Sequence, residues 1–196
     1  MNNEGFFSAR RITLLAILLA LVIALQAFGG SINIGAVQLN FTLIPIVLGA
    51  ILLGPTCGLI LGLACGIVVL IQVILGLVPF YTIIWTGAPV PAALTCVVKT
   101  TVAGFLSGLV YKVLQKKKAY LAIFVASAIV PIVNTGLFIV GCVFMWNAIA
   151  TIAGGSNMFG FILVSLVGFN FFVELAINLL VAPALYRVIK VVDKNF

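Results

Sequence analysis

The chain has 196 residues, of which 65% are hydrophobic and 7% charged, a composition that excludes a water-soluble globule and predicts a surface that faces lipid. In a membrane chain, the net charge of +7 reports on topology rather than on nucleic-acid binding. The absence of histidine excludes histidine-based catalysis and histidine-ligated metal sites, and we expect neither a catalytic residue nor a cofactor.

Six apolar runs have about the length that a helix needs to cross a bilayer, roughly 20 residues. In chain order they are residues 12–28, 37–53, 57–76, 92–111, 119–145 and 158–186. The second run contains Pro45, and only Gly54-Pro55-Thr56 separates it from the third, so a single broken helix is an alternative there. The sequence predicts an all-α membrane protein, with one six-helix integral membrane domain over residues 1–196.

Basic residues cluster before the first run, between the fourth and fifth runs, and after the sixth: Arg10, Arg11, Lys112, Lys116, Lys117, Lys118, Arg187, Lys190 and Lys194. The positive-inside rule places all three clusters in the cytoplasm, which requires an even number of crossings between them. Six spans satisfy this requirement, so we expect cytoplasmic N- and C-termini and a multi-pass protein of the cell membrane. A cleaved secretory signal over the first run would leave five spans and break this parity.

Two ionisable residues, Lys99 and Glu174, lie inside predicted spans, where a charge is costly unless it is paired or serves a site. One interpretation is a structural Lys99–Glu174 ion pair. The other is that Lys99 faces a cavity and binds an anionic ligand.

Further polar residues fall at similar depth in the last three spans. Asn170, Glu174 and Asn178 recur every four residues and form one polar stripe, which interhelical hydrogen bonds would explain. Thr95, Lys99, Asn134, Asn170 and Glu174 all lie in the outer half or near the middle of spans four to six. This grouping predicts a pocket open to the extracellular side.

The connections expected outside the cell carry no charge. Residues 77–91 contain Phe80, Tyr81, Trp85 and three prolines, typical either of an interfacial aromatic belt or of a stiff lid over a ligand. Residues 29–36 and the pair Trp146-Asn147 are candidates to complete such a lid. We therefore add Trp85, Trp146 and Asn147 to the candidate ligand-binding residues.

Small residues form two stripes with a spacing of four. Gly54, Gly58, Gly62 and Gly66 on the third run allow close helix packing, which we expect within this chain. Ala16, Ala20 and Ala24 form a similar stripe on the first run, for an internal helix or for another protein.

The sequence combines six spans of this size with Ala16-x-x-x-Ala20, the segment Leu43-Ile44-Pro45-Ile46-Val47-Leu48-Gly49 and the turn Leu53-Gly54-Pro55. In these features the chain resembles the substrate-binding S component of energy-coupling factor (ECF) transporters. The resemblance implies a vitamin-uptake subunit that binds its ligand from outside, under loops after spans one, three and five. It also implies that Ala16 and Ala20, extended by Ala24, dock on a membrane coupling subunit that joins two cytoplasmic ATPases. No phosphate-binding loop occurs in the sequence, in agreement with energy supplied by other subunits.

The substrate does not follow from the resemblance. Lys99 favours a carboxylate-bearing vitamin, namely pantothenate, biotin, lipoate or folate, whereas the aromatic residues suit riboflavin; pantothenate is the preferred candidate. The alternative function is a self-contained ion-coupled secondary transporter that uses Lys99 and Glu174 as a relay. An intramembrane enzyme lacks the necessary residues, and a structural subunit would leave the polar grouping without a role.

Overall fold

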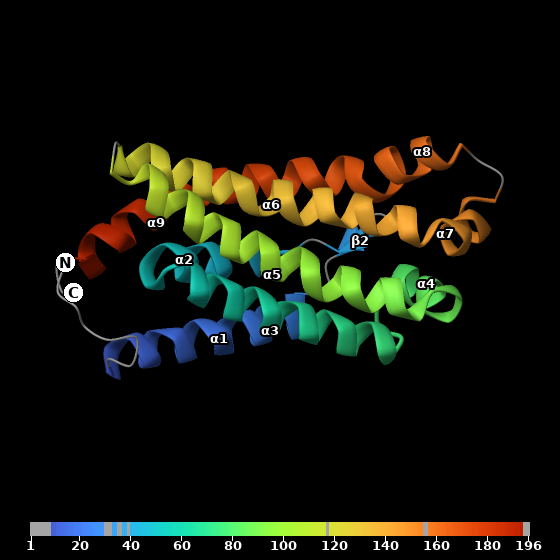
Figure 1. Cartoon of the computed structure of the whole chain (residues 1–196), viewed down its shortest axis with the longest axis horizontal. Helices are drawn as coiled ribbons and strands as arrows, with labels where there is room; N and C mark the ends of the chain where they lie inside the picture. Colours follow the sequence, from blue (N-terminus) through green and yellow to red (C-terminus); the bar gives the residue numbers. More distant parts are fainter. Residues whose placement is uncertain are drawn as a thin grey trace.

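The computed structural model describes residues 9–29, 33–34, 37–38, 40–116, 118–154 and 157–193. Long helices run side by side along the longest axis of the molecule (Figure 1). The helices are α1 (Ala9–Gly29), α2 (Leu43–Leu53), α3 (Pro55–Ile74), α4 (Pro79–Gly87), α5 (Pro89–Leu114), α6 (Ala119–Phe144), α7 (Trp146–Ala153), α8 (Met158–Gly160), the π-helix η1 (Phe161–Gly168) and α9 (Phe169–Asp193). Two short strands, β1 (Asn33–Ile34) and β2 (Val37–Gln38), pair antiparallel between α1 and α2.

Within the described residues, five helical segments are long and apolar enough to cross a membrane: α1, α3, α5, α6 and the continuous segment of η1 and α9. The prediction of a sixth full-length span over residues 37–53 is wrong in its first part. Val37 and Gln38 belong to β2, and α2 begins only at Leu43. Its 11 residues rise about 16 Å, roughly half the hydrocarbon thickness.

The path of the chain brings the basic residues to one end of the bundle. The left end of the bundle in Figure 1 contains the start of α1, the turn from α2 to α3, the turn from α5 to α6 and the end of α9. The basic clusters of the described residues lie at these turns and termini, whereas Lys117 and Lys194 fall outside the described residues. The short α2 thus returns the chain toward the basic end.

The glycine stripe packs α3 against α5, as predicted. A Cβ atom on Gly62 would lie 2.8 Å from the carbonyl carbon of Thr100, and one on Gly66 would lie 2.7 Å from the Cα of Val97. Only glycine permits backbones to approach this closely. The four cysteines lie buried in the core, each as a free thiol.

Two connections predicted as outer loops are mostly helical. Residues 77–91 form α4 and the beginning of α5, with Pro79 and Pro89 near the N-terminus of each helix. Proline suits the first turn of a helix because the N–H that it lacks has no partner there. Trp146 begins a second short helix, α7. Both α4 and α7 lie at the end of the bundle opposite the basic residues (Figure 1).

Candidate functional site

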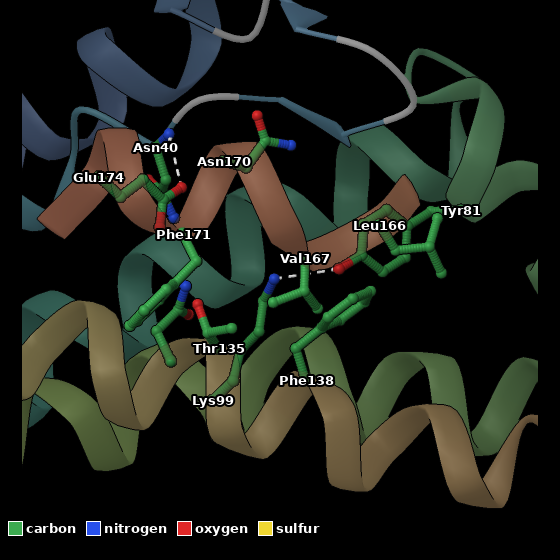
Figure 2. Close-up of a pocket in the computed structure, with 11 residues that line it drawn as sticks. Asn40, Tyr81, Lys99, Thr135, Phe138, Leu166, Val167, Asn170, Phe171 and Glu174 are labelled. Carbon is green, nitrogen blue, oxygen red and sulfur yellow. Dashed lines mark hydrogen bonds between the residues drawn. The ribbon is translucent and has the colours of Figure 1, made fainter. Parts of the chain in front are cut away.

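A central cavity lies among α4, α5, α6, η1, α9 and the residue that precedes the turn into α2 (Figure 2). It is lined by Asn40, Tyr81, Lys99, Asn134, Thr135, Phe138, Leu166, Val167, Asn170, Phe171 and Glu174. Its volume is about 50 Å³, room for a few water molecules in this conformation. A larger ligand therefore requires its wall to move.

Lys99 lies against an aromatic wall of the cavity. Its Nζ donates a hydrogen bond to the hydroxyl of Tyr81 at 3.0 Å and lies 5.3 Å from the ring centroids of both Tyr81 and Phe138. Electron-rich ring faces attract a cation at this distance. Burial raises the pKa of Tyr81 to about 12, against the opposing charge of Lys99, so the phenol stays protonated at neutral pH.

Glu174 occupies a different side of the cavity from Lys99 (Figure 2). Its Oε1 accepts a hydrogen bond from the backbone N–H of Asn40 at 3.0 Å. Glu174 is the one acid whose side chain the structure describes, and it makes no ion pair with Lys99. The structural ion pair proposed from the sequence is therefore absent between these two residues. The cavity instead presents a cationic group and an anionic group separately.

Polar side chains of α6 and α9 add to the polar lining. Asn134 is 5% exposed, and its Oδ1 has no hydrogen-bond partner. Burying an acceptor without a partner costs about 1–3 kcal/mol. In a cavity wall such an atom indicates a position that a ligand donor would satisfy.

The π-helix η1 forms the cavity wall next to Asn170. Leu166 and Val167 of η1 line the cavity, and α9 begins directly afterwards at Phe169. Segments of π-helix are rare and occur frequently at functional sites. The predicted polar stripe of α9 faces protein: Asn170, Glu174 and Asn178 are 7%, 7% and 3% exposed.

The structure brings together four of the eight candidate ligand-binding residues, namely Lys99, Asn134, Asn170 and Glu174. Thr95 lies outside this cavity: it donates to the carbonyl of Pro91 and lines a second, apolar pocket of about 280 Å³, which Lys99 also borders. The remaining candidates also lie outside it: Trp85 is on α4, Trp146 of α7 packs against Phe159 of α8, and Asn147 is exposed.

Sequence reasoning missed most of the nonpolar wall. Tyr81 and Phe138 hold Lys99, yet aromatic residues in a membrane chain are equally typical of an interfacial belt. The spacing of four between Asn134 and Phe138, which places both on one helix face, was the available signal. Asn40 was not identified as a site residue because it lies inside the expected second span.

The alanine stripe of α1 points away from the bundle. Ala16, Ala20 and Ala24 are all exposed, whereas Leu18, Val22 and Gln26 are buried. Each alanine precedes a buried residue by two positions, or about 200° around the helix. The stripe therefore has no packing role among the described residues of this chain.

Comparison with known families gives one match. The family model described as ECF transporter, substrate-specific component, matches residues 10–186. Comparisons with curated proteins and with solved structures gave no significant match.

Proposed function

We propose that this chain, which belongs to the substrate-specific components of ECF transporters, binds its substrate in the central cavity. The proposed substrate is a carboxylate-bearing vitamin, and pantothenate is the preferred candidate. Members of this family are multi-pass membrane proteins that bind a small molecule and partner with an ECF module. Among the described residues, the cavity brings together Lys99 and Glu174, the two ionisable residues predicted to lie inside spans.

The observation that carries the proposal is a buried ammonium group with no carboxylate partner in its cavity. Lys99 is 9% exposed, and its hydrogen-bond partner is the neutral phenol of Tyr81. A buried charge is normally paired. A ligand carboxylate would pair it and displace few existing contacts.

Two further groups in the cavity restrict which ligands can bind there. The Oδ1 of Asn134 and the carboxylate of Glu174 are both acceptors, so they favour a ligand with hydrogen-bond donors at two positions besides its carboxylate. Pantothenate has a carboxylate at one end, an amide N–H in the middle and hydroxyl groups toward the other end. Riboflavin lacks the carboxylate, lipoate lacks the donors, biotin has donors at one end only, and folate is the bulkiest of the set.

The distribution of charge supports an orientation for uptake. With the basic end of the bundle in the cytoplasm, α4 and α7 face outward. Lys99 follows the start of α5 by ten residues, about 15 Å along the helix. The cavity then lies nearer the outer end, and the movement that widens it would admit substrate from outside.

The exposed alanine stripe supports the proposed assembly. Small side chains on an unpartnered membrane helix allow another helix to approach closely. We assign Ala16, Ala20 and Ala24 to contact with a membrane coupling subunit, which joins two cytoplasmic ATPases that supply the energy.

A binding panel tests the substrate. The detergent-solubilised protein is titrated with pantothenate, riboflavin, folate, biotin and lipoate, and binding is followed by tryptophan emission and by thermal shift. Trp85 lies on α4, four residues after Tyr81, and serves as the reporter. Saturable binding of pantothenate supports the proposal. Binding of riboflavin alone contradicts the role given to Lys99, and no response to any compound contradicts the assignment of a vitamin.

A further inference from the structure

A buried polar cluster joins α1 to α3 outside the cavity. The side-chain amide of Gln26 donates to Oε1 of Gln72 at 3.0 Å, and the amide of Gln72 donates to the backbone carbonyl of Gln26 at 3.0 Å. Both residues are 7% exposed. Paired amides in an apolar bundle fix two helices relative to each other, because separating them leaves buried polar groups without partners.

Thr42 extends this cluster to the start of α2. Its hydroxyl, in a residue that is 1% exposed, lies 3.4 Å from Oε1 of Gln26 and 3.2 Å from Sγ of Cys65, and it also contacts Oδ1 of Asn40. The backbone N–H of Asn40 in turn donates to Glu174. A continuous series of polar contacts therefore runs from α1 to the carboxylate in the cavity.

Helix α1, which carries Gln26 at one end of this series of contacts, packs against the bundle through one face. Its buried side chains Leu18, Val22 and Gln26 recur every four residues, and near its start Arg11 donates to the carbonyl of Leu53 at 3.3 Å. The exposed alanine stripe lies on the opposite face. Gln26 and the surface that we assign to the coupling subunit therefore lie on opposite faces of one helix.

We propose that Gln26, Thr42 and Gln72 are positioning residues that link Glu174 to α1, so that a ligand engaging Glu174 alters the placement of the alanine stripe. None of the three lines the cavity. The last step, from ligand to stripe, rests on the proposed function. The link itself does not, and it is tested without ligand.

Cys65 reports on the link because it is fully buried and its Sγ contacts Thr42. The test uses protein in which Cys57, Cys96 and Cys142 are replaced by alanine, and it follows the alkylation of Cys65 by N-ethylmaleimide with intact mass. Glu174→Gln weakens a charged hydrogen bond, and we expect it to raise the alkylation rate about tenfold. Thr42→Val is expected to raise the rate similarly, and Thr42→Ser to restore the parent rate.

The double variant Glu174→Gln, Thr42→Val decides whether both residues act through one link. Changes in a shared link are non-additive, so its rate should match that of the faster single variant. Multiplied rates, or a Glu174→Gln rate equal to the parent rate, would overturn the proposal. Gln72→Met provides a second break in the link if Thr42→Val does not fold.

Two controls exclude general loosening. Ser107→Ala removes a buried hydrogen bond to the carbonyl of Ala126, between α5 and α6, and should leave the alkylation of Cys65 unchanged. In protein that retains Cys142 alone, Glu174→Gln should leave the alkylation rate unchanged. An equal rise at Cys142 would show that the whole bundle opens and would overturn the proposal.

Saturating pantothenate tests whether a ligand in the cavity alters the link. We expect it to change the alkylation rate of Cys65 in the parent but not in the Glu174→Gln variant. An unchanged rate in parent protein that calorimetry shows to be loaded would overturn the coupling and leave the proposed function intact. Absence of pantothenate binding would instead count against the proposed substrate, and the ligand-free comparison would still decide on the link.

Discussion

Lys99 and Glu174 line one cavity without forming an ion pair: the ammonium group binds the hydroxyl of Tyr81, and the carboxylate binds the backbone N–H of Asn40. Opposite charges held apart in an apolar bundle are costly if their only role is structural. They are useful if a ligand supplies the complementary groups.

Asn134→Leu should separate ligand affinity from stability. Replacing a buried acceptor that lacks a partner removes its desolvation cost, so the ligand-free protein should melt at the same temperature or higher. Pantothenate affinity should fall by about 1 kcal/mol, or roughly fivefold, because one hydrogen bond is lost. Thermal melting without ligand and calorimetry with ligand measure the two effects.

Ser127→Ala is the matched control for this variant. Ser127 also carries a buried oxygen without a partner, but it does not line the cavity. It should affect melting in the same direction and leave the affinity unchanged. A similar loss of affinity in both variants would contradict a direct role for Asn134.

Ala20→Trp should block assembly with the coupling subunit and leave substrate affinity near normal. The indole would occupy the space into which a partner helix packs, whereas Ala20 is exposed in this chain and lies away from the cavity. Co-purification with the ECF module measures assembly. Leu180→Trp, at a residue 78% exposed on α9, is the control and should assemble. Equal loss in both variants would argue against a specific interface on α1.

Gly62→Val should destabilise the bundle by about 1–3 kcal/mol or more, the usual cost of overpacking. The added Cβ would meet the backbone of Thr100, which has no room to move between packed helices. Gly136→Ala is the control, because a Cβ at Gly136 has no neighbour within 4 Å. Thermal melting in detergent compares them, and equal melting temperatures would contradict the close contact of α3 and α5.

Two kinds of feature could be predicted from the sequence: the meeting of polar residues that are costly in lipid, and the close packing of a helix that carries evenly spaced glycines. Lys99, Asn134, Asn170 and Glu174 were predicted to meet because each is expensive unless it faces protein or a cavity. The glycine stripe was predicted to pack internally, and α3 and α5 meet there.

The features that the sequence did not reveal have ambiguous patterns. The apolar residues 37–53 are compatible with a full span, and the structure places only half of a span there. Residues 77–91 contain three prolines, typical of a loop but equally suited to two helix starts. Tyr81 and Phe138 are ordinary aromatic residues until tertiary packing places both against Lys99.

Recognition of the substrate carboxylate by Lys99 is tested by comparing pantothenate with panthenol, in which a primary alcohol replaces the carboxylate, on the parent protein and on Lys99→Met. Calorimetry should show that the parent prefers pantothenate. Lys99→Met should lose about 1.5–3 kcal/mol of pantothenate binding, roughly 10- to 150-fold, while retaining its affinity for panthenol. Equal pantothenate affinity in parent and variant, with both folded, would contradict the claim that Lys99 recognises the substrate carboxylate.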